Sequence, residues 1–289
     1  MMWGSPPIPA QTRVATMAEK CESLSRVLAC KTGGGGGGTG AGFPSFLPKE
    51  VEKIKDPFAR TLAQRIERLP VQIGISESCI MSSCVKPIIQ RETNPMVLLH
   101  CFDSSCLEWR CTYPLLEEAG LEVWAIDVLG WGFSDLERLP PCNAASKRHH
   151  LYQLWKSYIK RPMILVGPSL GAAVAVDFAV NYPEAVEKLV LINASVYGEG
   201  TGDLAKLPTI VAQGLVGRLH CLLPWWKDAT INFIFSGGYN VISQIKQRLH
   251  CELQDAILRK VPDCGHLPHV QKPRYVAKLI ADFARGDCH

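Results

Sequence analysis

The 289-residue chain has no long hydrophobic run: no apolar stretch approaches the ~18 residues that a membrane-spanning helix needs. A transmembrane segment is therefore not expected. The chain also lacks a basic stripe with interleaved aromatic residues, and its net charge is only +4. Nucleic acid is therefore not an expected partner.

No CxxC pair and no secretory signal accompany the twelve cysteines. Five of them cluster in the sequence: Cys79, Cys84, Cys101, Cys106 and Cys111. Their spacings do not match a zinc finger, so we expect neither a metal ion nor another cofactor. Most of the cysteines are predicted to be small, reduced residues of the core.

The composition divides the chain into a tail, residues 1–43, and a domain, residues 44–289. An unbroken glycine run at 33–38 predicts a flexible linker. The stretch before it is rich in serine and threonine and poor in acids, which partly fits an organelle transit peptide. A disordered cytosolic tail is the alternative, so a chloroplast and a cytoplasmic location both stay open.

Within the domain, residues 48–69 predict two short helices, the second beginning at the capping pair Asp56–Pro57. Strands then alternate with helices. Strands are expected at 96–99, 122–126, 163–166, 188–192 and 256–261, and helices near 107–119, 144–160, 170–180 and 273–285. This alternation predicts an α/β fold with a mostly parallel sheet covered by helices on both faces. Ligands of such folds bind at the carboxyl ends of the strands.

Residues 167–171 read Gly-Pro-Ser-Leu-Gly and lie between an expected strand and an expected helix. A strand, a G-x-S-x-G turn and a helix in that order predict a nucleophile elbow. Ser169 would then lie at the carboxyl end of a strand, beside the positive end of a helix dipole. Because the pattern also occurs by chance, it needs oxyanion donors upstream and an acid and a histidine downstream.

The upstream donors are expected on the loop after strand 96–99. In a hydrolase with such an elbow, that loop supplies one backbone N–H and the residue after the nucleophile supplies the other. These donors would be Phe102 and Leu170. Loss of one such donor costs about 3–4 kcal/mol of barrier.

A further turn carries a family resemblance. Its residues, which match the pattern D-x-x-G-x-G-x-S-D, are Asp127, Gly130, Gly132, Ser134 and Asp135. With the elbow, residues 44–289 resemble the α/β-hydrolase superfamily of the AB hydrolase-1 type, and residues 99–109 are similar to an uncharacterised plant subfamily. The resemblance implies an α/β-hydrolase fold with a short lid at 194–235 and a small-molecule substrate, an apolar ester. Cys101 stands where the family usually has glycine.

The end of the chain extends the resemblance. Residues 265–273 resemble the family's G-H-x-P-H-x-x-K-P ending. The match implies that His266 is the catalytic base and that His269 orients the loop.

The acid of the triad is not assigned. The resemblance implies an aspartate in the window 236–241, yet no Asp or Glu occurs between Asp228 and Glu252. An alternative family position falls near Asn193, which is an amide. The remaining carboxylates match no family position: Asp203, Glu252, Asp255 and Asp263. The simplest interpretation is that a strand and its acid loop are missing between Gln247 and Arg248, as in a splice variant or a faulty gene model.

Two functions therefore stay open. One is a serine hydrolase in which Ser169 attacks an ester or related carbonyl and His266 transfers the proton, with activity impaired by the absent acid. The other is a non-catalytic or truncated family member that binds a ligand or has no activity. Lyase chemistry or a receptor role on the same fold is a third alternative, because fold alone does not fix function.

Overall fold

A computed structural model describes residues 42–73, 79–194, 214–241 and 256–287. The tail up to residue 41, part of the predicted lid and the Gln247–Arg248 junction lie outside the described residues. The transit-peptide, linker and junction hypotheses therefore stay predictions. The described residues belong to one compact unit that begins at Gly42.

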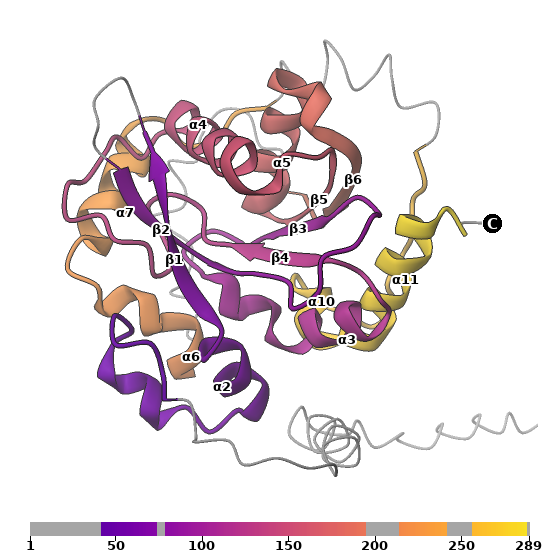
Figure 1. Ribbon diagram of the computed structural model, residues 1–289, viewed down its shortest axis with the longest axis horizontal. Coiled ribbons are helices and arrows are strands. Elements are labelled where there is room, and N and C mark those ends of the chain that lie inside the picture. Colours follow the sequence, from indigo (N-terminus) through magenta and orange to yellow (C-terminus); the bar gives the residue numbers. More distant parts are fainter. Residues whose placement is uncertain (1–41, 74–78, 195–213, 242–255, 288–289) are drawn as a thin grey trace, which may run out of the picture. The chain divides into compact units, whose positions relative to one another are not determined.

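A six-stranded sheet forms the centre of this unit, with strand order β1-β2-β4-β3-β5-β6 (Figure 1). The strands are β1 (Ile66–Gln72), β2 (Cys79–Val85), β3 (Met96–Leu99), β4 (Val123–Ile126), β5 (Met163–Pro168) and β6 (Val186–Ile192). β3 pairs in parallel with β4 and β5, and β5 pairs in parallel with β6. β2 runs antiparallel to β1 and β4. The sheet is mostly parallel, as the sequence predicts.

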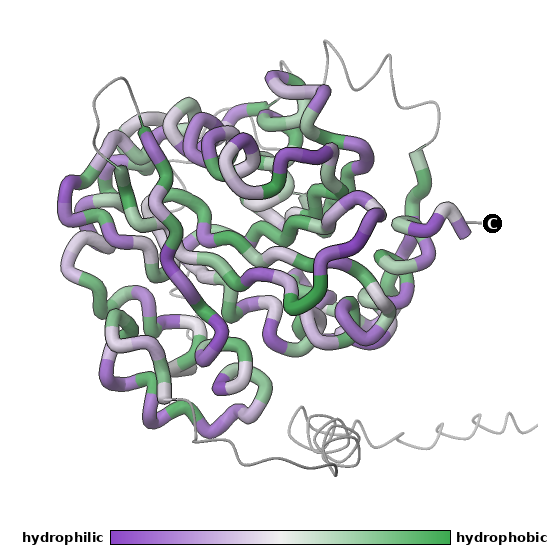
Figure 2. Tube along the Cα trace, viewed as in Figure 1, coloured by the Kyte–Doolittle hydropathy of each residue, from purple (hydrophilic) through white to green (hydrophobic). Residues whose placement is uncertain are grey.

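The inner strands are apolar because both faces of the sheet are covered. Every residue of β3, β4 and β5 is buried. Successive residues alternate between two hydrophobic cores: Val97 and Leu99 belong to one, Met96 and Leu98 to the other. Figure 2 shows the strands at the middle of the fold as largely hydrophobic.

Helices supply the other half of each core. The α-helices are α2 (Pro57–Ala63), α3 (Tyr113–Glu118), α4 (Ala144–Leu154), α5 (Leu170–Asn181), α6 (Gly214–Arg218), α7 (Trp226–Phe235), α10 (Pro268–Gln271) and α11 (Pro273–Arg285). Short 3-10 and π segments are η1 (Lys49–Lys53), η2 (Cys106–Cys111), η3 (Trp155–Ile159), η4 (Pro183–Ala185) and η7 (Leu219–Leu222). In Figure 1, α4 and α5 cover one face, and α3 and α11 cover the other. Among the described residues, none of the helices has the length and hydrophobicity of a membrane span.

One sequence prediction fails at the start of the domain. The helix predicted to run to residue 69 ends at Ala63, and β1 begins at Ile66. The predicted helix start is confirmed, since the Asp56 side chain accepts hydrogen bonds from the first-turn N–H groups of Phe58 and Ala59. The helix ends early because Ile66 pairs with Val85 of β2, a long-range contact that local periodicity does not contain.

A second prediction fails at the other edge of the sheet. Residues 256–261 form no strand, and Leu258 is 93% exposed. A hollow of about 690 Å³ separates this segment from β6 and α11. β6 is more exposed than the inner strands of the sheet, since Ile192 is the only one of its residues that is buried. β6 is the edge strand of the sheet, and residues 256–261 lie across the hollow from it without pairing to it.

Candidate active site

Ser169 lies at the turn between β5 and α5 with an unusual backbone. Its φ and ψ are 49° and −114°, values that cost a non-glycine residue conformational energy. The Ser169 N–H donates to the carbonyl oxygen of Ile192 at 2.9 Å, which ties the turn to the end of β6. The partly exposed side chain therefore stands at the carboxyl ends of two parallel strands.

The two glycines of the turn are required by close backbone contacts. A Cβ atom on Gly167 would lie 2.2 Å from the carbonyl oxygen of Gly171. A Cβ atom on Gly171 would lie 2.7 Å from the carbonyl oxygen of His100. The strand-to-helix turn is thus too tight for any side chain at either position.

The expected oxyanion donors lie on the two segments that meet here. Leu170 is the first residue of α5, and Phe102 follows β3 on the loop that begins with His100. Within the part of the chain that the structure describes, neither N–H donates to another protein group. Both are therefore available to a ligand oxygen.

The loop after β3 is fixed by the buried imidazole of His100. Its Nδ1 donates to the carbonyl oxygen of Cys101 at 2.7 Å, and its Nε2 accepts from the N–H of Val128 at 3.0 Å. Burial lowers the pKa of His100, so the ring is neutral and acts as a structural bridge. Cys101 fits the glycine position of the family because the left-handed residue of this loop is Asp103, with φ 49°.

The turn 127–135 supports the same loop. The fully buried carboxylate of Asp127 accepts the N–H groups of Cys106 at 2.6 Å and Phe133 at 2.8 Å, and the Ser83 hydroxyl also donates to it. A Cβ atom on Gly132 would lie 2.0 Å from the Asp127 carboxyl carbon. The turn motif therefore has a structural role.

The two downstream histidines have different surroundings. His266 is exposed, and its imidazole has no hydrogen-bond or ion partner among the described residues. His269 is buried, and its Nε2 lies 2.8 Å from Glu108 Oε1. Burial alone would raise the pKa of Glu108, but the hydrogen bond and charge of His269 outweigh it and lower the pKa to about 2. His269 thus anchors its loop to η2, as the resemblance implies.

Among the described residues, no carboxylate lies where the acid of a catalytic triad would contact His266. Asn193, at the alternative family position, donates its amide to the backbone oxygens of Gly265 and His266 rather than to the imidazole. Asp263 is exposed and forms no ion pair there. Asp203, Glu252 and Asp255 lie outside the described residues. No described carboxylate lies within 4.0 Å of the His266 ring nitrogens.

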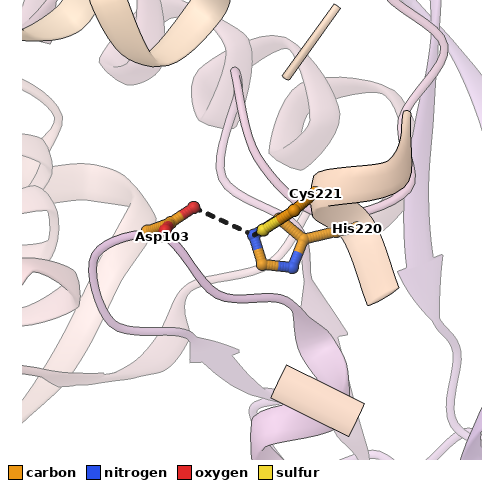
Figure 3. Close-up of side chains that lie close together, drawn as sticks. All are labelled: Asp103, His220 and Cys221. Atoms are coloured by element: carbon orange, nitrogen blue, oxygen red, sulfur yellow. Dashed lines mark hydrogen bonds and ion pairs between the residues drawn. The ribbon is translucent and has the colours of Figure 1, made fainter. Parts of the chain in front are cut away.

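The structure also brings together side chains that the sequence analysis does not single out (Figure 3). Asp103 Oδ1 accepts hydrogen bonds from His220 Nε2 at 3.1 Å and from Trp226 Nε1 at 2.6 Å. Burial alone would lower the pKa of His220, but its hydrogen bonds with Asp103 and Cys221 raise the pKa to about 9. Asp103 lies 117 positions before His220, so no local sequence signal joins the two residues.

A mostly parallel sheet with a strained serine elbow after β5 defines the α/β-hydrolase class. The profile of the alpha/beta hydrolase fold family matches residues 94–257, and the chain belongs to this family. The alpha/beta hydrolase domain-containing protein VTE7 of Arabidopsis thaliana is 57% identical over 303 aligned positions, which cover 86% of this chain and 92% of the relative. The alignment is longer than the chain, so part of the relative lies opposite gaps in this chain.

Solved structures agree on the fold. A carboxylesterase, CesB of Bacillus subtilis, matches with a TM-score of 0.56 and 16% identity, over 82% of this chain and 98% of that chain. A meta-cleavage product hydrolase of Pseudomonas fluorescens matches with a TM-score of 0.57 and 17% identity, over 77% and 99%. At these identities the likeness concerns the fold alone.

Proposed function

We propose that this chain is a serine hydrolase that acts on an ester or related carbonyl substrate. Ser169 attacks the carbonyl carbon, and His266 takes the hydroxyl proton and returns it to the leaving group. The N–H groups of Phe102 and Leu170 stabilise the oxyanion. The observation that carries the proposal is the strained Ser169 backbone between two glycines that admit no side chain.

The surroundings of the loop after β3 favour an apolar substrate. Phe102, Trp225 and Trp226 are all partly exposed next to a buried hydrophobic core. Trp226 belongs to α7 and contacts Asp103, the residue after Phe102. An ester with an apolar acyl or alcohol group would bury this aromatic surface and gain about 25 cal/mol for each Å² removed from water.

We further propose that activity is impaired because a strand and its acid loop are missing. The hollow beside β6 and the alignment gaps relative to VTE7 both support this. In serine proteases, loss of the acid lowers turnover by about 10⁴, near 5.5 kcal/mol. We therefore expect slow turnover, with Ser169 still able to act as the nucleophile but less reactive than in a complete triad.

A fluorophosphonate probe tests the nucleophile, because it reports one covalent step and needs no knowledge of the substrate. We expect labelling of the wild-type chain and none of Ser169→Ala. Ser236→Ala, which removes the hydroxyl of an exposed residue directly after α7, is the matched control and should label like the wild type. A folded wild-type chain that takes no label would contradict the proposal.

The missing acid favours a second function, that of a non-catalytic binding protein. The exposed His266 without a described partner is the observation behind it. Turnover of an aryl ester separates the two functions. Turnover that Ser169→Ala abolishes excludes the binding protein, whereas ligand binding with no turnover excludes the hydrolase.

Insertion, between Gln247 and Arg248, of a VTE7 segment that lies opposite a gap in this chain tests the missing strand. We expect the chimera to unfold at a higher temperature and to hydrolyse esters faster than the natural chain. A scrambled segment of equal length is the control. Equal stability and turnover for the VTE7 and scrambled chimeras would contradict the missing-strand proposal.

A further inference from the structure

Three ligand-type side chains converge between the loop after β3 and the lid region. Asp103 comes from the loop, and His220 and Cys221 come from η7. One ligand atom from each of the three side chains lies within 4.8 Å of the ligand atoms of the other two. Figure 3 shows the three side chains pointing toward one another.

The geometry of this cluster differs from that of a simple ion pair. His220 Nε2 lies 3.1 Å from Asp103 Oδ1 and 3.6 Å from Cys221 Sγ. One ring nitrogen therefore faces both a carboxylate oxygen and a thiol sulfur, each of which can also bind a metal ion. A cation between the three atoms would satisfy all of them together.

The distances suit a tetrahedral metal ion. With metal–ligand bonds of about 2.0–2.3 Å, neighbouring ligand atoms around Zn²⁺ lie about 3.3–3.6 Å apart. Both measured separations from His220 Nε2 are close to this edge length. Small side-chain rotations would complete a three-ligand face.

We propose that Asp103, His220 and Cys221 bind a divalent transition-metal ion of the zinc class, with a fourth position open to water. An imidazole, a thiolate and a carboxylate are the donor set that Zn²⁺ accepts, and the two anionic groups balance its charge. Asp103 and Cys221 are partly exposed, which gives an ion access, while His220 is buried. The Trp226 indole N–H donates to Asp103 Oδ1 at 2.6 Å and so helps to orient this carboxylate, as outer partners do in metal sites.

A bound ion would join η7 of the lid region to the loop that carries Phe102. It would thereby fix the lid against the loop after β3. Metal binding does not depend on Ser169 chemistry, so the site can be tested whether or not the proposed function holds.

Titration of the purified, metal-free chain with Co²⁺ tests the site, since a thiolate ligand gives a charge-transfer band in the near ultraviolet. We expect a saturable band at one equivalent and its loss in Cys221→Ser. Cys264→Ser is the matched control, because Cys264 is also a partly exposed free thiol, hydrogen-bonded to Gln271 instead. No band in the wild type, or an unchanged band in Cys221→Ser, would overturn the proposal.

A second test measures how well the protein competes with a chromophoric chelator for Zn²⁺. It includes a variant that should bind Zn²⁺ more tightly, a result that unfolding of the chain would not produce. Arg218 acts electrostatically on Asp103, so Arg218→Gln removes a positive charge near the site and should tighten Zn²⁺ binding. His220→Ala should weaken binding at least about tenfold. Equal affinity in His220→Ala, or weaker binding in Arg218→Gln with its circular dichroism unchanged, would overturn the proposal.

Discussion

Asn193 holds the backbone of His266: its side-chain Nδ2 donates to the His266 carbonyl oxygen at 3.0 Å. A second hydrogen bond joins the same amide to the Gly265 oxygen at 3.3 Å. Asn193 directly follows β6, so this contact bridges the sheet edge and the histidine loop. An amide serves here because it is a donor facing two acceptors.

Asn193→Asp should therefore weaken the loop rather than supply the absent acid. The carboxylate would face two carbonyl oxygens, lose both hydrogen bonds and repel them. We expect a lower melting temperature and slower fluorophosphonate labelling of Ser169. Asn193→Gly is the control, because it keeps the left-handed backbone, φ 43°, and removes only the amide. Faster labelling of Asn193→Asp would mean that the carboxylate reaches the imidazole.

Gly167→Ala should destabilise the elbow. The new Cβ would lie 2.2 Å from the Gly171 carbonyl oxygen, a backbone atom that cannot move without shifting α5. We expect a loss of about 1–3 kcal/mol or more in urea unfolding, together with loss of labelling at Ser169.

The matched control for Gly167→Ala is Gly42→Ala, since a Cβ at Gly42 meets nothing within 4 Å. Its stability should stay within about 0.5 kcal/mol of the wild type. Equal stability of Gly167→Ala and Gly42→Ala would show that the turn relaxes easily.

The strand–turn–helix geometry around Ser169 was predictable because its determinants are local. The apolar runs that become β3, β4, β5 and β6, the helix after Ser169 and the glycines beside it all lie within short windows. The D-x-x-G-x-G-x-S-D turn is local too, and Gly132 is fixed by Asp127 within the same turn. Residues that act over a few positions leave a pattern that can be recognised in one sequence.

The remaining features depend on pairings between distant parts of the chain. β1 was predicted as helix because Ile66 and Leu69 fit a helical spacing, whereas β2 pairing decides their conformation. His150 of α4 is buried with its Nε2 2.8 Å from the Ser82 hydroxyl of β2, a contact that spans 68 positions. The contact of Asp103 with His220 spans 117 positions and has no sequence signature. The periodicity of a sequence indicates which face of a helix or strand is buried. It does not indicate which distant segment packs against that face.

Glu108→Gln should remove an acid-sensitive part of the stability. The folded pKa of Glu108 is about 2, below its ordinary value of 4.5, because His269 hydrogen-bonds to it. Because the pKa of this carboxyl group is lower in the folded chain than in the unfolded chain, its ionisation stabilises the fold. This stabilisation is complete above the pKa of the unfolded chain and is lost as the pH falls toward 2. The shift corresponds to about 3 kcal/mol at neutral pH.

Urea unfolding at pH 7 and pH 3 measures the effect of Glu108→Gln. Wild type should exceed the variant at pH 7, and the difference should shrink at pH 3. Glu118→Gln, on the neighbouring helix α3, is the control and should show no such change. A difference between wild type and Glu108→Gln that is the same at both pH values would contradict the assignment of Glu108 as the titrating group.

Lys147→Met should stabilise the chain most at neutral and lower pH. Lys147 is 1% exposed, and burial lowers its pKa to about 7. Its Nζ lies 3.7 Å from the Trp131 ring centroid and donates a hydrogen bond to the Leu129 carbonyl oxygen. Because the unfolded lysine keeps its proton up to its ordinary pKa of 10.5, wild-type stability should rise with pH between about 7 and 10. The advantage of Lys147→Met in urea unfolding should therefore shrink by about 1.4 kcal/mol per pH unit above pH 7.

Lys227→Met, at an exposed position of α7, should show no pH-dependent difference from wild type. A constant gap between wild type and Lys147→Met from pH 7 to pH 9 would mean that Lys147 stays charged when buried, held by the Leu129 oxygen and the Trp131 ring.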